Sequence, residues 1–230
     1  MTFTINCRGK ATREINRELR AAVAAGQREI VVLEPDARHN LGVALLEAVR
    51  IVFEGSVGYY CGGMADGAHL EIRGSAGWGA AESMLNGTVL IDGNAGSGIA
   101  ASVRGGTVVV RGDAAARAGV SMKGGTLVIG GNCGYMAGFM MQKGRILICG
   151  DAGNALADSM YEGAVYVGGS IASLGNDAVI MDPVEEERIA LQQVLQSYRI
   201  PAPSAFKKVV AGRKLWNFDK TEQEVWKAAL

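Results

Sequence analysis

Apolar and polar residues recur along the chain with a period of 19 residues from Arg50 onward. Residues 50–163 divide into six complete rows of that length, and residues 164–177 form a partial seventh row without insertion or deletion. The second and fourth positions of every row are aliphatic, except for Phe53 in the first row. A fixed period of this kind indicates stacked, nearly equivalent structural units.

The columns of the repeat predict one strand and one corner in each row. The second and fourth positions share a face of a strand, because side chains alternate with a period of two. A small polar residue follows the sixth position, where we expect glycine to supply an unusual φ at a corner. The sixth-position glycines are Gly55, Gly74, Gly93, Gly112, Gly131, Gly150 and Gly169.

These columns predict a mainly β fold, a single-stranded right-handed parallel β-helix of about seven 19-residue coils over residues 50–178. The rows lack the LxxLxLxxN pattern of leucine-rich repeats. The period is also not a multiple of six, as the hexapeptide acyltransferases would require. Methionine at the sixteenth position of several rows suits irregular gaps inside the coil.

The flanking segments predict a cover for each end of the rod, because an open sheet edge must be protected. Residues 1–49 read as an α/β cap with strands at Thr2–Asn6 and Glu29–Leu33 and a helix at Thr12–Ala25. We expect a second short helix at Leu41–Val49 leading into the first coil.

Residues 179–230 predict a helix followed by a partner-binding tail. Asp182 and Pro183 suit the first positions of a helix, Glu185 suits a capping box, and the helix should end before Pro201. Two interpretations of the aromatic residues beyond the helix stay open, packing on the rod and contact with a partner. These residues are Phe206, Trp216, Phe218 and Trp226.

Composition narrows the classes of function. The formal net charge is zero and the pI is about 6.7, so nothing favours nucleic acid or an anionic membrane as a partner. The N-terminus lacks the apolar run of a signal peptide, and no stretch reaches the length of a membrane span. Four cysteines without a CxxC pair favour free thiols, and we expect a cytoplasmic protein.

The sequence offers no convincing catalytic, cofactor-binding or metal-ligating residues. His39 and His69 are the only histidines, and their positions favour surface or interface roles over catalysis. The Gly-x-Gly strings recur with the repeat, so corner geometry explains them better than phosphate binding. Cys61, Cys133 and Cys149 fall in small or apolar columns and are expected to be unreactive core residues.

The repeated rows resemble a known family, the GXGXG domain. Residues 74–79, 93–98 and 131–138 carry the most diagnostic glycines, and the resemblance covers roughly residues 38–177. In that family the domain is the C-terminal β-helix of the glutamate synthase large subunit, and it also forms a separate β-helical subunit of formylmethanofuran dehydrogenase. As a free-standing chain of this size, the sequence resembles the small subunit of N-methylglutamate synthase in particular.

The resemblance implies a non-catalytic structural subunit within a larger enzyme. It implies two partners, an amidotransferase-like subunit and an FMN-containing synthase subunit, with FMN and an iron–sulfur cluster in a partner and no cofactor in this chain. One alternative is the β-helical subunit of a formylmethanofuran dehydrogenase or of the related formyltransferase/hydrolase complex. Another is an independent β-helical binding protein or carbohydrate enzyme, which rows of constant length without long loops disfavour.

Overall fold

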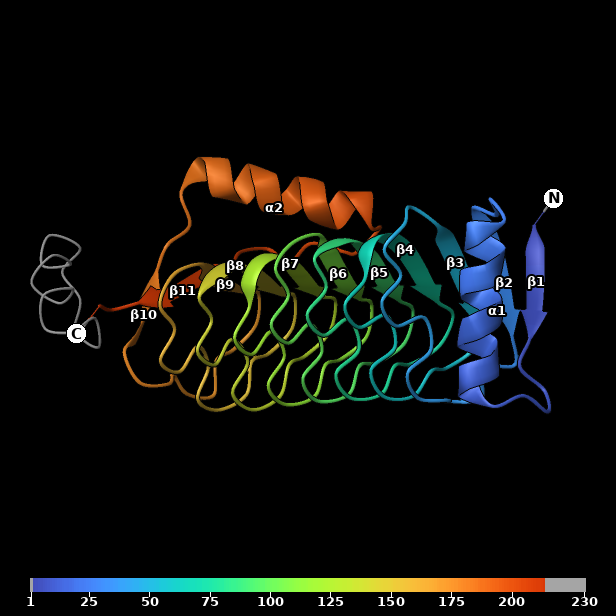
Figure 1. Cartoon of the computed structure of the whole chain (residues 1–230). Coiled ribbons are helices and arrows are strands. Elements are labelled where there is room, and N and C mark those ends of the chain that lie inside the picture. Colours follow the sequence, from blue (N-terminus) through green and yellow to red (C-terminus); the bar gives the residue numbers. More distant parts are fainter. Residues whose placement is uncertain (1, 214–230) are drawn as a thin grey trace, which may run out of the picture.

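The chain forms one long rod, described for residues 2–213 of a computed structural model (Figure 1). Eleven strands in this range make a single sheet with the order β1 to β9 and then β11 and β10. Their bounds are β1 (Phe3–Asn6), β2 (Glu29–Leu33), β3 (Arg50–Glu54), β4 (Asp66–Ile72), β5 (Asn86–Ile91), β6 (Thr107–Val110), β7 (Lys123–Ile129), β8 (Lys143–Ile148), β9 (Ala164–Val167), β10 (Ala178–Met181) and β11 (Lys207–Ala211). The helices in this range are α1 (Thr12–Ala24) and α2 (Glu185–Ser197).

The strands stack in the register that the repeat predicts. Each strand from β3 to β9 pairs in parallel with the next, and second-position residues lie beside one another, as Ile51 does beside Leu70 and Leu70 beside Val89. We call this side, formed by β3–β9, the strand wall. The parallel β-helix and its repeat are therefore confirmed.

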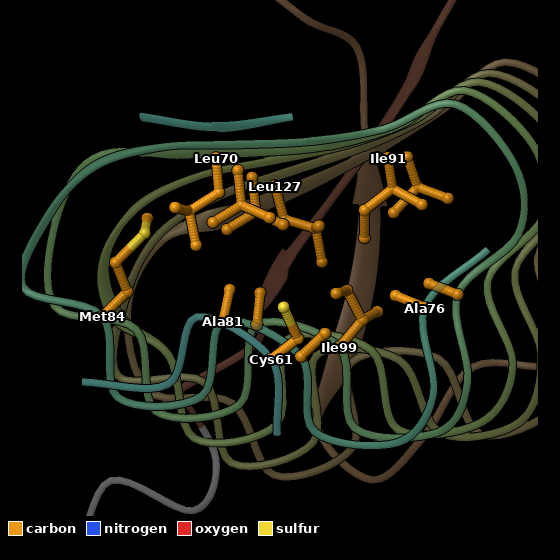
Figure 2. Close-up of a cluster of buried hydrophobic side chains, with 14 of the residues drawn as sticks. Cys61, Leu70, Ala76, Ala81, Met84, Ile91, Ile99 and Leu127 are labelled. Carbon is orange, nitrogen blue, oxygen red and sulfur yellow. The ribbon is translucent and has the colours of Figure 1, made fainter. Parts of the chain in front are cut away.

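The core fills the interior of the coils with one layer of side chains per row (Figure 2). Leu70, Ile91 and Leu127 project inward from the strand wall, and Ala81 and Ile99 approach from the opposite side. Met84 closes the end of the section, as expected for the sixteenth position. These side chains have at most 2% of their surface exposed, so the rod has a continuous apolar core.

The opposite side of the rod consists of the segments between strands, residues 55–65, 73–85, 92–106, 111–122, 130–142 and 149–163, which we call the turn wall. The eleventh, thirteenth and fifteenth positions of each complete row have a positive φ. The thirteenth-position residues are all glycine or alanine, whereas Tyr60 and Arg117 are eleventh-position residues in this conformation. The repeat pattern does not predict these left-handed residues, and the conformation costs roughly 1–2 kcal/mol for each non-glycine residue.

Hydrogen bonds between coils explain why the turn wall keeps this conformation. The N–H of Gly79 donates to the Ser97 carbonyl of the next coil over 2.9 Å, and the N–H of Ser83 donates to Ala101 over 2.8 Å. Between them, the N–H of Ala81 donates to Cys61 of the preceding coil over 2.8 Å. The alternation satisfies backbone groups on both sides of each coil, which buried backbone requires.

The predicted reason for the sixth-position glycines is wrong for six of the seven. Only Gly55 among them has a positive φ. At Gly74 a Cβ atom would lie 2.6 Å from the Ser56 nitrogen, and at Gly112 it would lie 2.9 Å from the Gly93 carbonyl oxygen. Glycine is needed here because adjacent coils approach too closely for any side chain.

The seventh-position residues form a polar ladder beside these glycines. Each side-chain oxygen accepts a hydrogen bond from the backbone N–H of the next row's seventh residue, as Asn94 does from Asp113 over 2.8 Å and Asp113 from Asn132 over 2.7 Å. The ladder runs from Ser56 to Ser170. The predicted bonding of this column to neighbouring backbone is confirmed.

The N-terminal segment continues the rod instead of only covering it. β2 pairs in parallel with β3, and β1 pairs in parallel with β2, so the sheet extends across residue 49. The predicted strands and first helix are present. The predicted helix at Leu41–Val49 is wrong, because Gly42 and Ala44 have positive φ and the N–H of Ala44 bonds to Gly63 of the next coil over 2.9 Å.

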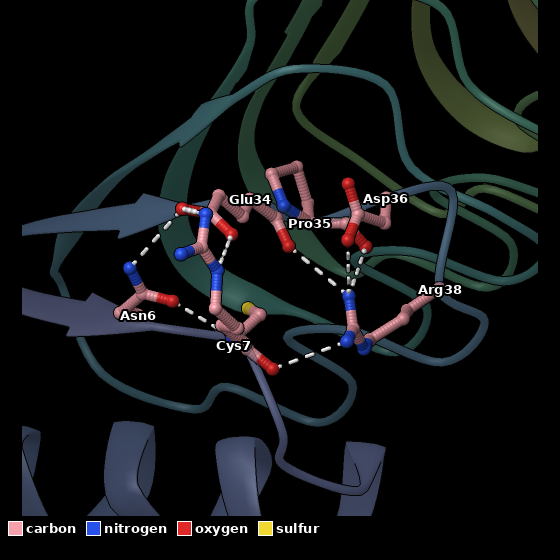
Figure 3. A network of polar contacts seen from close by, with 7 residues as sticks. Asn6, Cys7, Glu34, Pro35, Asp36 and Arg38 are labelled. Atoms are coloured by element: carbon pink, nitrogen blue, oxygen red, sulfur yellow. Dashed lines mark hydrogen bonds and ion pairs between the residues drawn. The ribbon is translucent and has the colours of Figure 1, made fainter.

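A polar network joins the first two strands to the loop that follows them (Figure 3). The guanidinium of Arg38 donates to the carbonyls of Glu34 and Cys7, at 3.1 Å in each case. Arg8 and Glu34 form a bidentate pair at 2.8 and 2.9 Å. These contacts fix the entry of the chain into the first coil.

Helix α2 lies along the outer face of the strand wall (Figure 1). Leu191 and Leu195 are buried there against the third-position residues Val109, Val128 and Leu147. In the second row the third position is Glu71, which pairs instead with Arg50 at 2.6 Å and Arg73 at 3.3 Å. The third-position residues of the fourth to sixth rows thus form the apolar surface on which the helix packs.

The start of α2 differs from the prediction. Val184 is the N-cap residue, so Asp182 and Pro183 precede the helix, and Glu187 rather than Glu185 bonds back to the Val184 N–H over 3.0 Å. Glu187 also accepts hydrogen bonds from Tyr166 at 2.8 Å and Lys208 at 2.6 Å. These bonds to the rod explain why the helix begins two residues later than expected.

Part of the predicted tail forms β11, which inserts antiparallel between β9 and β10 and covers the end of the parallel sheet. Phe206, just before β11, packs against the core beneath α2. For this residue, the interpretation that the aromatic side chains pack on the rod is confirmed. Trp216, Phe218 and Trp226 lie outside the described residues.

Candidate functional site

The two histidines lie apart in the fold and neither has the surroundings of a catalytic base. His69 is an exposed residue in β4, between Arg50 and Thr88 of the adjacent strands. His39 is also exposed, and its Nδ1 accepts a hydrogen bond from the backbone N–H of Tyr59 over 3.0 Å. This bond gives His39 a structural role at the start of the rod.

The cysteine thiols are buried in the core or partly buried beside it. Cys61 and Cys133 are at most 4% exposed, and Cys149 is partly buried. Burial raises the pKa of the Cys133 thiol to about 12 and that of Cys149 to about 11. Burial also raises the pKa of the Cys61 thiol. These thiols stay protonated near neutral pH and are poor nucleophiles.

No group of three or more histidine, cysteine, aspartate or glutamate residues that could hold a metal ion occurs within residues 2–213. No helix in the same range is long and apolar enough to cross a membrane. On the surface of the described part of the rod, the turn wall carries a row of stacked aromatic rings.

Three rings from successive coils form an exposed ladder on the turn wall. His39 stacks on Tyr59 with centroids 4.2 Å apart, and Tyr59 stacks on Trp78 with centroids 5.3 Å apart. The rings lie within 15° of parallel. Although they stack on each other, Tyr59 and Trp78 remain 46% and 60% exposed.

The ninth-position glycines of the second and third rows leave room for the ladder as well as for the backbone of the preceding coil. Each ring leans over the ninth-position glycine of the next row, where a Cβ atom would collide with it. At Gly77 this atom would lie 2.9 Å from Cδ1 of Tyr59, and at Gly96 it would lie 2.6 Å from Cδ1 of Trp78. The glycines that identify the repeat thus also make room for the rings.

The ladder ends at a trough of about 500 Å³ on the turn wall. Its lining includes the aromatic residues Trp78 and Tyr60 and small residues such as Ser97 and Gly98. The Tyr60 hydroxyl donates a hydrogen bond to Glu82, which raises the pKa of Tyr60. Arg117 lines the trough from the coil beyond. Stacked rings beside a cation suit recognition of another molecule. In the sequence, the feature that could have indicated this site is the pair Tyr59 and Trp78, the tenth residues of the first two rows.

Comparisons with known proteins agree with this architecture. The GXGXG motif family matches residues 36–229. Protein GlxC of Rhizobium meliloti (strain 1021) is 40% identical over 80 residues, which are 34% of this chain and 35% of GlxC. The chain thus aligns with about a third of that relative's length.

A solved structure shares the fold. It is a chain in the X-ray structure of the formyltransferase/hydrolase complex FhcABCD from Methylorubrum extorquens, solved with methylofuran. The TM-score is 0.66 at 28% sequence identity, and the match covers 74% of this chain and 67% of that chain. That protein works as part of a complex of several subunits. Because the family match spans most of the sequence, this chain belongs to the GXGXG motif family.

Proposed function

We propose that this chain is a non-catalytic structural subunit of a multi-subunit, glutamate-synthase-like enzyme, and specifically of N-methylglutamate synthase. The observation that carries the proposal is the GXGXG family match over residues 36–229, together with the rod of stacked coils in the described part of the chain. A rigid rod with a continuous core can hold two larger subunits at a fixed separation.

The partners in this proposal are an amidotransferase-like subunit and a synthase subunit that carries FMN and an iron–sulfur cluster. An iron–sulfur cluster needs thiolates that converge on one point. In this chain Cys61, Cys133 and Cys149 belong to different coils and are kept protonated by burial. The proposal therefore assigns both cofactors to the synthase subunit and gives this chain the task of docking.

A second candidate is the corresponding subunit of a formyltransferase/hydrolase complex. The observation that favours it is the fold match to a chain of FhcABCD at 28% identity. The β-helix would serve the same architectural purpose there, but the partners would be an amidohydrolase-like chain and a formyltransferase.

Mild affinity purification of the tagged chain from its native source, with mass spectrometry and an absorption spectrum, tests both candidates. An amidotransferase-like chain together with a flavin spectrum is the result expected for N-methylglutamate synthase. An amidohydrolase-like chain with bound metal and no flavin would support the second candidate instead. Recovery of the chain alone, without colour or partner, would contradict the structural-subunit proposal.

A further inference from the structure

The aromatic ladder stops where the trough begins, and the sequence of one column explains why. The tenth position is Tyr59 in the first row and Trp78 in the second, but Ser97 in the third and Ala116 in the fourth. The stacked rings are spaced at 4.2 and 5.3 Å, close to the roughly 4.8 Å between coils. The next place in the stack lies above Ser97, whose side chain is too small to fill it.

Trp78 is therefore the last ring of a stack that has room for one more. It lines the trough and remains 60% exposed. A planar ring supplied from outside would continue the ladder over Ser97 and bury the open face of Trp78. Such offset stacking is worth roughly 0.5–1.5 kcal/mol beyond the apolar area that it buries.

Two charged side chains line the trough, Glu82 and Arg117, and they differ in their hydrogen-bond partners. The Glu82 carboxylate already accepts a hydrogen bond from the Tyr60 hydroxyl. Arg117 is exposed, and its guanidinium has no ion pair or side-chain hydrogen bond with any residue that the structure describes. Arg117 thus offers an unused positive charge on the same surface as the open face of Trp78.

We propose that this trough docks a segment of a partner subunit, which places an aromatic side chain on Trp78 and a carboxylate on Arg117. The inference rests on the proposed function, because it names the surface by which the structural subunit holds one of its partners. Tryptophan, tyrosine and arginine dominate the energetics of protein interfaces, and this trough presents all three. Its position on the outer wall of the rod leaves it accessible to a large partner.

Three substitutions test the contact in complexes reconstituted from the chain and the partner subunits identified by purification. Trp78→Ala should weaken binding of one partner by about thirty-fold, as expected for a hot-spot residue. Ser97→Trp should weaken binding of this partner to a similar extent, because the new ring would stack on Trp78 where the partner's aromatic side chain is proposed to bind. If Trp78 served only the stability of the rod, Ser97→Trp would leave binding unchanged.

Arg117→Glu should weaken the same partner by at least about tenfold, and an aspartate or glutamate to lysine change in the partner segment should restore binding. Matched controls lie elsewhere on the rod. Tyr161→Ala removes a similarly exposed ring, and Arg104→Glu reverses an exposed charge in the seventeenth position of the third row, six columns away from Arg117. Neither control should weaken binding of that partner by more than about twofold, and melting temperatures check that each variant folds.

Photo-crosslinking in the native complex identifies the occupant. A diazirine-bearing aliphatic residue at Val120 lines the trough without filling the space over Ser97. The expected product joins Val120 to a partner peptide that contains an aromatic residue and a carboxylate. A crosslink to residues 214–230 of this chain, a crosslink to a second copy, or no crosslink would overturn the inference.

The two proposals fail in different ways. If the wild-type chain recovers a multi-subunit complex that Trp78→Ala, Ser97→Trp and Arg117→Glu all leave intact, the docking site is wrong and the structural-subunit proposal stands. If the wild-type chain recovers no partner, the proposed function fails and the docking site fails with it.

Discussion

Coils stack on one another along both walls of this rod, but the backbone conformation differs between the two walls. The strand wall uses aliphatic residues in extended backbone, with positive φ confined to single glycines near the starts of β4, β5, β7 and β8, and its inward-facing side chains fill the core. The turn wall places at least three residues of each complete row at positive φ, and its backbone bonds alternately to the coils on either side. We infer from this contrast that stability resides mainly in the strand wall, whereas the turn wall accepts backbone strain and presents a variable outer surface.

The largest effect should come from a cavity in the strand wall. Leu127 is fully buried in β7, and Leu127→Ala should lower the free energy of unfolding by about 3–4 kcal/mol. Urea unfolding followed by circular dichroism measures this loss. A loss below about 1 kcal/mol would show that the coils collapse around the cavity and that the wall is less rigid than we infer.

Two glycine substitutions distinguish two reasons for glycine in the repeat, close approach of a neighbouring coil and a positive φ. Gly112→Ala should cost about 2–3 kcal/mol, because the new methyl group would press on Gly93 and Asn94 of the preceding coil. Gly98→Ala should cost only about 1 kcal/mol, since its φ is +71° but no atom other than the Gly79 nitrogen, at 3.9 Å, lies within 4 Å of the added Cβ. Equal melting temperatures for the two variants would contradict the close-approach explanation.

The attachment of α2 to the strand wall should depend on pH through Glu187. Burial by itself would raise the pKa of this carboxyl, but hydrogen bonds from Lys208, Tyr166 and the Val184 N–H together hold it below its usual value of 4.5. A depressed pKa stabilises the fold at pH values above 4.5, and this stabilisation is lost as the pH falls through the folded-state pKa.

Glu187→Gln should therefore cost about 1–2 kcal/mol at neutral pH and much less in acid, where the native carboxyl is protonated. Urea unfolding of both proteins at about pH 7 and about pH 3 checks this difference. Glu185→Gln is the control, because Glu185 forms only an exposed ion pair with Arg188. An equal loss of unfolding free energy at both pH values would show that the effect of Glu187→Gln does not depend on the charge of the carboxylate.

The smallest effect should come from the turn wall. Ala100 is fully buried with a φ of +57°, so Ala100→Gly loses a methyl contact but relieves backbone strain. We expect a change within about 0.5 kcal/mol of zero. Ala118→Gly, at an equally buried position without positive φ, should cost about 1–2 kcal/mol. Equal losses in thermal unfolding would argue against strain in the turn wall.

The strand wall could be predicted from the amino-acid sequence alone, because one residue type per column and a constant row length leave little choice of register. The strict alternation in positions two and four predicted which side chains would meet in the core, as Leu70 and Leu127 do. The resemblance carried by the glycine rows likewise predicted the family. The sequence offers no convincing catalytic motif, and together with the family resemblance this led to the structural-subunit hypothesis that the experiments above test.

The remaining features came only from the three-dimensional fold, because they depend on contacts between residues far apart in the chain. The left-handed backbone at Tyr60 and Arg117 arises from hydrogen bonds between coils, and no local preference of these residues predicts it. Glycine at position 112 owes its place to the neighbouring coil and not to its own φ. The trough likewise exists only because stacking brings Trp78, Ser97 and Arg117 from three successive rows onto one surface.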